Sequence, residues 1–412
     1  MFDVEKIRND FPMIKNNKDL IYFDSSATSF KPQCVIDEIV NFYTTKNTNI
    51  HRGDYDLSFK VSKEYEDTRN VIAKFLNADD PRCIVYTNGS TSSLNTVAYG
   101  YGRKFLKEGD VILTTNAEHA SNILPWFKTA EATKAEIRFI PLNNDGTFDL
   151  KKFEECFTEN VKIVSLPHVS NVLGYVYPIK KICEIAHLHG AIVNVDGAQS
   201  VPHIKVDVKD LDVDFLSFSS HKMLGPAGIG ILYGKYELLD KMDPLMYGGD
   251  SNARFNSQGD IILKNVPYKF ESGTPCIEGV LGLNKAVSYL MEVGMVNIEE
   301  YTSELTEYFM DKLSKLDNVV VYNKESRSGI VTFNIKDVFA QDAASYFNKK
   351  GIAVRSGNHC AKILVDVLGV NETVRASMYL YNTKDEIDKF IEIIKDTTLE
   401  KCVDSVLWWT KK

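Results

Sequence analysis

The sequence predicts an α/β protein: a large domain with a mostly parallel seven-stranded sheet, followed by a smaller C-terminal α+β domain. From about residue 80 to 235, short runs rich in Val and Ile alternate with helical patterns. Parallel strands that are covered on both faces have such near-continuous apolar sequences. After Gly329 the order becomes strand, helix, strand and closing helix, which indicates a second structural unit.

Seven strands are expected in the large domain, each bounded by turn residues or by a helical stretch. They are residues 84–87, 111–114, 137–140, 161–166, 191–195, 214–218 and 228–233. Residues 240–275 are irregular, and a long helix begins near Glu278. The smaller domain is expected to contain strands 330–334, 352–355 and 373–377 and helices 342–350 and 384–399.

These patterns divide the chain into three parts. Residues 1–20 are expected to form an N-terminal segment that packs with the small domain. Residues 21–280 are expected to form the large domain, and residues 281–412 the small domain, which carries a cysteine loop.

Composition excludes several classes of protein. The 412 residues are 44% hydrophobic and 25% charged, as in globular proteins, so a disordered chain or a coiled-coil rod is excluded. The net charge of -8 disfavours a nucleic-acid partner. The seven cysteines are an odd number without a C-x-x-C pair, which fits neither a disulfide framework nor a zinc ribbon. No signal peptide or apolar run of about 18 residues is evident, so we expect no membrane contact and a cytoplasmic protein.

Polar residues follow three of the expected strands. Gly89-Ser90-Thr91 lies between a strand and a helix, where free N–H groups suit a phosphate, although an ordinary helix cap is the alternative. Asp196 ends another apolar strand, where a structural salt bridge is the alternative, and Lys222 follows the next strand in Ser219–Lys222. Because ligands gather at the carboxyl ends of such strands, this combination suits pyridoxal 5'-phosphate. The lysine would bind the cofactor covalently, and the aspartate would keep the pyridine nitrogen protonated.

The chain resembles the SufS-like cysteine desulfurase / selenocysteine lyase family of class-V aminotransferase-type pyridoxal-phosphate enzymes. The matching motifs extend over nearly the whole chain in the family's order. They are Tyr22–Thr28, His51–Gly53, Glu118-His119 with Asn122 and Pro125-Trp126, His168–Gly174, Val195–Gln199, Ser219–Lys222, Phe270–Pro275, Arg355–Cys360 and Arg375–Ser377. The resemblance implies the fold-type I architecture of pyridoxal-phosphate-dependent transferases.

The resemblance implies specific roles at the cofactor. Lys222 would bind the cofactor, Asp196 would pair with the ring nitrogen, Gln199 would bond the ring hydroxyl and His119 would stack on the ring. Four residues are implied at the phosphate: Ser90, Thr91, Ser219 and His221. Thr274 would reach the phosphate of the other subunit, because the family builds its site at a homodimer interface.

The resemblance also implies substrate contacts. Arg375 would hold the substrate carboxylate with help from Asn171. Three further basic residues near the site have less defined roles: His51, Arg52 and Arg355. No metal is expected.

Cys360 is the expected nucleophile. It follows a strand in a glycine-containing loop, and positive neighbours such as Arg355 and His359 would favour its thiolate. The resemblance implies that L-cysteine is converted to L-alanine while its sulfur passes to Cys360 as a persulfide. Selenocysteine is a further possible substrate. The sulfur would go to an acceptor protein, for iron–sulfur clusters or another sulfur-containing cofactor. The other six cysteines are expected to be bystanders.

Four positions depart from the family pattern. Asn358 stands where a histidine is usual, and no proline follows Cys360 in Ala361-Lys362-Ile363. Ser92 replaces a glutamate in the phosphate turn. Gln341 replaces the histidine that precedes the small-domain aspartate in members that pass sulfur to a zinc-containing acceptor, which puts such a partner in doubt.

Three other functions stay open. Another pyridoxal-phosphate lyase or an aminotransferase would use the same fold. A catalytically silent sulfur-relay or scaffold protein would not need Lys222, Asp196 and Cys360. A thiol hydrolase would need Cys360 and His359 as a pair, but adjacent residues on a strand point apart.

Overall fold

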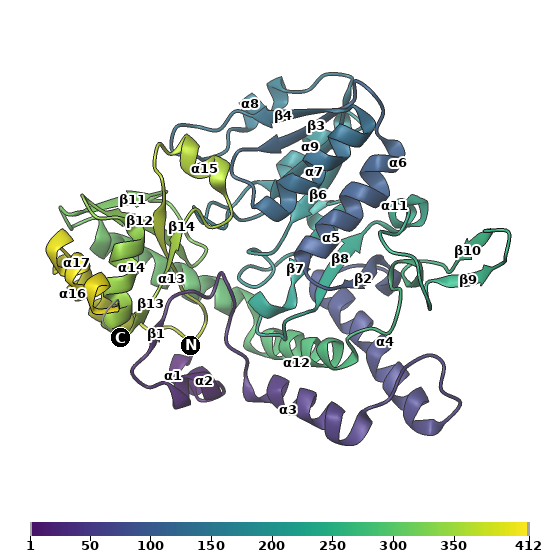
Figure 1. Cartoon of the computed structure of the whole chain (residues 1–412), viewed down its shortest axis with the longest axis horizontal. Coiled ribbons are helices and arrows are strands. Elements are labelled where there is room, and N and C mark those ends of the chain that lie inside the picture. Colours follow the sequence, from purple (N-terminus) through teal and green to yellow (C-terminus); the bar gives the residue numbers. More distant parts are fainter. Residues whose placement is uncertain (1, 410–412) are drawn as a thin grey trace.

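The computed structural model describes residues 2–409 and contains a large and a small domain (Figure 1). The large domain is built on a seven-stranded sheet in the order β2-β8-β7-β6-β5-β3-β4, in which only β8 is antiparallel to its neighbours. The strands are β2 (Ile84–Thr87), β3 (Val111–Thr115), β4 (Glu136–Ile140), β5 (Val161–Pro167), β6 (Ile192–Asp196), β7 (Phe215–Ser219) and β8 (Gly230–Gly234). The predicted mostly parallel seven-stranded sheet is confirmed.

Alternate residues of the sheet belong to two different apolar clusters. Val111 and Leu113 of β3 belong to a cluster with residues of α4, α9 and α12, whereas Ile112 belongs to a cluster with Trp126 of α7. Both faces of the sheet are therefore covered, which explains the apolar runs. The helices of this part of the chain are α3 (Gln33–Asn41), α4 (Asp56–Leu76), α5 (Ser90–Val97), α6 (Arg103–Phe105), α7 (Ala120–Thr133), α8 (Leu150–Glu155), α9 (Ile179–Leu188), α10 (Val208–Leu211), α11 (Tyr236–Lys241) and α12 (Ile277–Val293).

The small domain contains a four-stranded antiparallel sheet in the order β11-β12-β15-β14. Its elements are α13 (Met295–Leu313), β11 (Val319–Tyr322), β12 (Ile330–Ile335), α14 (Ala340–Lys349), β13 (Ile352–Ala353), β14 (Arg355–Gly357), α15 (Lys362–Val367), β15 (Thr373–Ser377), α16 (Lys384–Lys395) and α17 (Leu399–Trp409). A separate apolar cluster fills this domain, with Phe309, Phe333 and Phe390 among its members.

Several elements differ from the sequence prediction. The expected strand 352–355 is two short strands, because β13 leaves the small-domain sheet to pair in parallel with β1 (Ile21–Tyr22). The expected helix 384–399 ends at Lys395, before Thr397 and Thr398, where the chain turns into α17. Strand β11 and the hairpin of β9 (Asn252–Phe255) and β10 (Ile261–Leu263) were not predicted, although the valines and tyrosine of β11 favour a strand.

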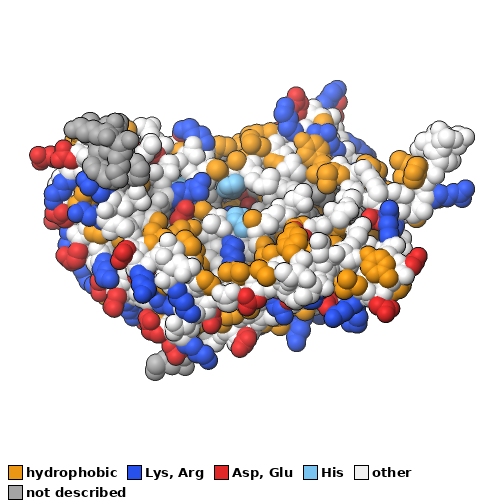
Figure 2. Space-filling model, turned by 60° about the horizontal axis from the view of Figure 1, so that its bottom comes forward, with side chains coloured by type: hydrophobic (Ala, Val, Ile, Leu, Met, Phe, Trp, Pro, Cys, Tyr) orange, Lys and Arg blue, Asp and Glu red, His pale blue; other side chains and the backbone are white. Residues whose placement is uncertain are grey.

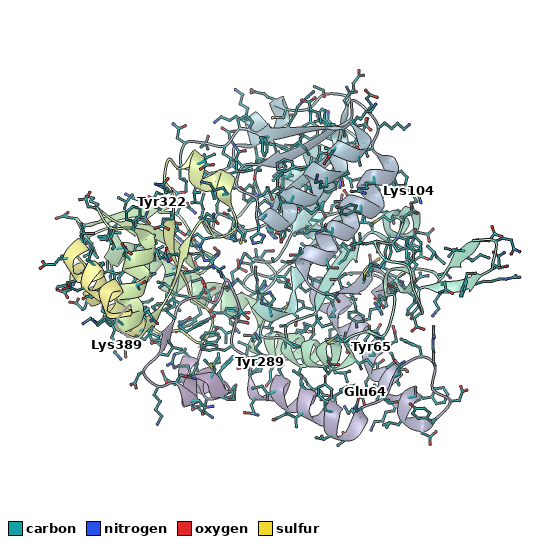
Figure 3. The ribbon with its side chains drawn as sticks, viewed as in Figure 1. Glu64, Tyr65, Lys104, Tyr289, Tyr322 and Lys389 are labelled. Carbon is teal, nitrogen blue, oxygen red and sulfur yellow. The ribbon has the colours of Figure 1, made fainter. Side chains whose placement is uncertain are left out.

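The N-terminal segment contacts both domains. Helix α1 (Val4–Arg8) reaches the small domain, because Arg8 Nη1 donates to Glu386 Oε1 at 2.9 Å. Beyond α1 and before α2 (Pro12–Asn16), Asp10 accepts a 2.8 Å hydrogen bond from Tyr289 of α12, the residue labelled in Figure 3. Phe23 belongs to the small-domain cluster. The domain boundaries at residues 20 and 280 remain predictions.

A buried carboxylate joins three elements of the large domain. Asp214, which is 4% exposed, accepts hydrogen bonds from the Val193 backbone at 2.7 Å and from His187 Nε2 at 2.8 Å, and Lys235 Nζ lies 2.9 Å away. The hydrogen bond to Asp214 raises the pKa of His187, against the effect of burial. The imidazolium form of His187 is therefore stabilised in the folded state.

Replacing Asp214 with asparagine should lower the free energy of unfolding by about 1–3 kcal/mol, because buried donors lose a charged acceptor. Because the pKa of His187 is raised in the folded protein, the His187–Asp214 pair stabilises the fold fully below about pH 6.5. This stabilisation is lost as the pH rises through the pKa of His187 in the folded protein. The difference in melting temperature between the wild-type protein and Asp214→Asn should therefore be larger at pH 5.5 than at pH 9. Asp212→Asn is the control, because that exposed carboxylate binds the same two cations. An equal loss in both variants would contradict the assignment.

No helix within residues 2–409 is both long and apolar enough to cross a membrane.

Candidate active site

A cavity of about 240 Å³ lies where the carboxyl ends of the large-domain strands meet the small domain. It brings together twelve of the predicted site residues: Ser90, Thr91, His119, Asn171, Asp196, Gln199, Ser219, His221, Lys222, Arg355, Cys360 and Arg375. Figure 2 shows a hollow near the middle of the molecule, at which pale blue histidine side chains are visible. Ser90, Asp196 and Lys222 lie at or just after the carboxyl ends of large-domain strands, which explains why the sequence pattern could group them.

Asp196 and Lys222 line the cavity from the large domain. Asp196 is the last residue of β6, and its Oδ1 accepts the Ala198 N–H at 3.0 Å. Burial raises the pKa of Asp196, although the Ala198 N–H and Lys222 oppose this. Burial also lowers the pKa of Lys222 to about 8, against the attraction of Asp196. Burial therefore favours the neutral form of both groups, and a neutral amine is the nucleophilic form of lysine.

Gln199 and His119 line the same cavity. Gln199 Nε2 donates to the Ser26 carbonyl at 2.9 Å, whereas its buried Oε1 has no hydrogen-bond partner among the described residues. His119 caps the N-terminus of α7, and its Nδ1 accepts the Ser121 N–H at 3.1 Å. Burial and the positive charges of Lys222 and Arg375 lower the pKa of His119 to about 4. His119 is therefore a neutral ring at pH 7.

The turn before α5 also lines the cavity. Ser219 Oγ accepts the Ser90 N–H at 2.8 Å and donates to Ser90 Oγ at 3.0 Å, while Thr91 and Ser121 share a 2.7 Å hydroxyl contact. Gly89 has φ of 144°, and a Cβ on Gly230 would lie 2.4 Å from the Gly89 Cα, so neither glycine tolerates a side chain. The close approach of β8 thus fixes the turn. Its hydroxyls and the N-terminus of α5 are suited to a phosphate.

Arg375 is the buried cation on the small-domain side. Its Nη1 donates to the Asn171 carbonyl at 2.8 Å and its Nη2 to Asp24 Oδ1 at 3.2 Å, whereas its buried Nε has no hydrogen-bond partner among the described residues. Arg355 of β14 lies opposite Arg375 of β15 in the antiparallel register. Two arginines at one point of the cavity favour an anionic ligand such as a carboxylate.

Cys360 lines the cavity from an exposed loop of the small domain. Its carbonyl accepts the Ala120 N–H of α7 at 2.7 Å, and the preceding carbonyl of His359 accepts Asn171 Nδ2 at 2.8 Å. The Asn171 side chain therefore holds the cysteine loop in this structure, and its predicted contact with a substrate carboxylate remains a prediction.

His359 does not provide the positive charge expected beside Cys360. Burial, with the charges of Arg375 and Arg355, lowers the pKa of His359 to about 3, so its ring is neutral. Its Nε2 lies 2.9 Å from Thr373 Oγ1, and its buried Nδ1 has no partner among the described residues. The expectation of a cationic His359 was therefore wrong. A Cys–His pair for thiol hydrolysis is not formed either.

Three predicted site residues lie outside this cavity in the single chain. His51 is 3.5 Å from Glu66, and Arg52 is 2.6 Å from Asp250. Thr274 lines a separate cavity of about 190 Å³ beside Ser92. The roles of these three residues remain predictions.

Sequence reasoning assigned no role to three polar residues that the structure places at the site. Ser26 and Ser121 line the cavity, and Asp24 binds Arg375. The signal was available for Asp24 and Ser26, because both lie in the motif Tyr22–Thr28 that carried part of the resemblance. No group of three or more His, Cys, Asp or Glu side chains within residues 2–409 is arranged to hold a metal ion.

The fold and this site define a class of protein. The family model "Aminotransferase class-V" matches residues 21–390, and the chain belongs to that family. A probable cysteine desulfurase of Halalkalibacterium halodurans is 46% identical over 398 residues, which cover 96% of this chain and 98% of the relative. A probable cysteine desulfurase of Staphylococcus aureus is 43% identical over 401 residues, with 96% and 97% covered.

Solved structures agree with these sequence relatives. The cysteine desulfurase CsdA from Escherichia coli has a TM-score of 0.90 at 34% identity, and the match covers 98% of this chain and 99% of that one. The apo cysteine desulfurase from Thermococcus onnurineus has a TM-score of 0.91 at 37% identity, with 95% and 97% covered. The predicted family and the predicted fold-type I architecture are confirmed.

Proposed function

We propose that the protein is a pyridoxal-phosphate-dependent cysteine desulfurase that converts L-cysteine to L-alanine and receives the sulfur on Cys360. One observation carries this proposal: Lys222, Asp196 and Cys360 line the same small cavity, although they come from different domains. The enzyme class agrees with whole-length relatives that are named cysteine desulfurases.

The residues of the cavity fit pyridoxal phosphate. Gln199 has a buried oxygen that a ring hydroxyl could satisfy, Asp196 offers a carboxylate for a ring N–H, and the turn of Ser90 and Thr91 offers donors to a phosphate. Lys222 would hold the cofactor covalently, and the neutral ring of His119 would lie against its face. When bound, this cofactor withdraws electrons from the amino-acid carbon next to the nitrogen.

The chain's own groups supply the remaining chemistry. Arg375 and Arg355 bind and orient the substrate carboxylate, and the Lys222 amine removes the Cα proton and returns a proton to the carbon skeleton. The Cys360 thiolate attacks the substrate sulfur, so that an S–S bond forms as the C–S bond breaks. The carbon skeleton keeps the electron pair and is protonated to alanine. The overall reaction is balanced, because L-cysteine and the Cys360 thiol give L-alanine and the Cys360 persulfide.

The proposed enzyme is a homodimer. Large apolar side chains are exposed on α3, α4, the loop 245–247 and the β9–β10 hairpin, among them Val40, Phe59, Tyr247 and Phe255. Figure 2 shows such side chains on the right half of the molecule, towards the hairpin. Patches of this kind mark association surfaces, and a second copy would bring Thr274 towards a neighbouring phosphate site. Sedimentation should therefore give twice the 46.5 kDa of one chain.

Sulfur delivery is proposed to an acceptor protein in the cytoplasm, for iron–sulfur clusters or another sulfur-containing cofactor. The exposed position of Cys360 supports this proposal, because a persulfide there would be accessible. All seven cysteines are free, which suits a reducing compartment.

A direct assay tests the proposed function. The purified protein, loaded with pyridoxal phosphate, is incubated with L-cysteine or L-selenocysteine in the presence of a thiol reductant. Alanine should form in equal amounts with sulfide or selenide. Pyruvate and ammonia in place of alanine would identify a different lyase, and transfer of the amino group to a keto acid would identify an aminotransferase.

A further inference from the structure

The loop that carries Cys360 has an unusual backbone conformation. His359 and Cys360 have φ of 52° and 57°, so two successive residues with side chains lie in the left-handed region. This region is sterically unfavourable for residues other than glycine, and asparagine and aspartate tolerate it best. The loop can hold this conformation only if surrounding contacts fix it.

Contacts from other elements fix part of the loop. The Cys360 carbonyl is bonded by the Ala120 N–H at 2.7 Å, the His359 carbonyl by Asn171 at 2.8 Å, and the His359 ring lies against Thr373. These contacts hold two carbonyl groups and one buried side chain. They do not involve the N–H of Cys360 itself.

Asn358 provides that remaining contact. Its Oδ1 accepts the Cys360 N–H at 3.0 Å, and its main-chain carbonyl accepts the Ala361 N–H at 2.8 Å. An asparagine side chain has the right length to accept a hydrogen bond from the backbone two residues ahead, which stabilises a turn. Asn358 thus closes the turn on both sides of the cysteine, although its own side chain is exposed.

We propose that Asn358 is a positioning residue for sulfur transfer: its amide oxygen holds the left-handed turn that presents the Cys360 thiol to the cavity. This inference rests on the proposed desulfurase function. The amide carries no charge at any working pH, so the acceptor neither titrates nor adds a negative charge beside the thiol. Asn358, which stands where the family usually has a histidine, therefore has a local structural role.

Three variants test the proposal: Asn358→Ala, Asn358→Asp and, as the control, Asn371→Ala, which changes an exposed asparagine of the same domain. Asn358→Ala should lower kcat for alanine formation by about ten- to a hundredfold, because a misplaced reacting group loses orientation. The KM for L-cysteine and the absorbance of the bound cofactor should stay unchanged. Asn371→Ala should behave like the wild-type protein.

Asn358→Asp separates positioning from charge. Aspartate keeps the acceptor for the Cys360 N–H, so it should recover most of kcat at alkaline pH. Its negative charge disfavours the thiolate, so its pH–rate profile should shift to higher pH than that of the wild-type enzyme. Amide hydrogen exchange of the peptide 355–364, measured without cofactor or substrate, should be faster in Asn358→Ala than in Asn358→Asp.

Two results would overturn the proposal. One is a kcat of Asn358→Ala within about twofold of wild type, which is the usual outcome for an exposed side chain without a role. The other is equal loss in both variants at every pH, with unchanged hydrogen exchange. Failure of the desulfurase function is distinguishable from both, because the wild-type protein would then form no alanine, while the exchange of the peptide 355–364 would still report on the turn.

Discussion

Cys360→Ala is expected to form alanine from L-cysteine at least about a hundredfold more slowly than the wild-type enzyme, because the group that accepts sulfur is removed. The variant should still bind pyridoxal phosphate and L-cysteine, since Lys222, Asp196 and Arg375 are unchanged. Mass spectrometry of the wild-type protein after one turnover should find one extra sulfur on Cys360 and none on the variant.

Cys156→Ala is the matched control for this prediction. Cys156 is partly buried at the end of α8 and lines neither the cavity nor the one beside Thr274, so its loss should leave turnover unchanged. Full desulfurase turnover by Cys360→Ala would refute the role of this thiol. Decomposition of selenocysteine can persist in Cys360→Ala, because selenium is a better leaving group than sulfur.

Lys222→Ala is expected to abolish turnover and covalent binding of the cofactor. Lys222 is the half-buried amine that lines the cavity, and its lowered pKa of about 8 keeps a substantial neutral fraction near pH 8. For the wild-type protein, covalent binding of added pyridoxal phosphate should therefore become faster as pH rises through 8, where the ammonium loses its proton. The measurement is cofactor absorbance together with the mass of the Lys222 peptide after borohydride reduction.

Lys269→Gln controls for the loss of any buried lysine. Lys269 is buried, and it donates to the carbonyls of Asp240 and Met242, away from the cavity. Its replacement should lower thermal stability and leave covalent cofactor binding intact. If Lys222→Ala still bound the cofactor covalently, another amine of the chain would have to be the attachment point.

The large-domain part of the site could be predicted because its determinants are local in sequence. Each strand is an apolar run, and Asp196 and Lys222 follow two such runs directly. Parallel strands end at one edge of the sheet, so order along the chain translates into proximity in space. The family resemblance added Cys360, Arg375 and Asn171, which no periodicity indicates.

Other features depend on contacts that sequence patterns do not contain. The pairing of β1 with β13 joins residues about 330 positions apart in the chain through two-residue strands. Strand β11 was missed for another reason: its three valines and tyrosine favour a strand, and this signal was overlooked. The position of His359 next to Cys360 predicts a positive neighbour for the thiol, whereas burial lowers the pKa of His359 and makes its ring neutral. Burial of a single side chain is a tertiary property, and for that reason it reverses an expectation drawn from neighbours in the chain.

The bond between Arg375 and Asp24 has a consequence for selectivity. Asp24 already occupies one nitrogen of the guanidinium, and the Asn171 carbonyl occupies another, so the cation is turned in a fixed direction before any ligand arrives. A substrate carboxylate therefore meets an Arg375 guanidinium whose charge is partly balanced by Asp24 and whose orientation is already fixed. Amino acids whose carboxylate lies in the guanidinium plane and accepts from the unpaired Nε are favoured, because the other two nitrogens are already bonded.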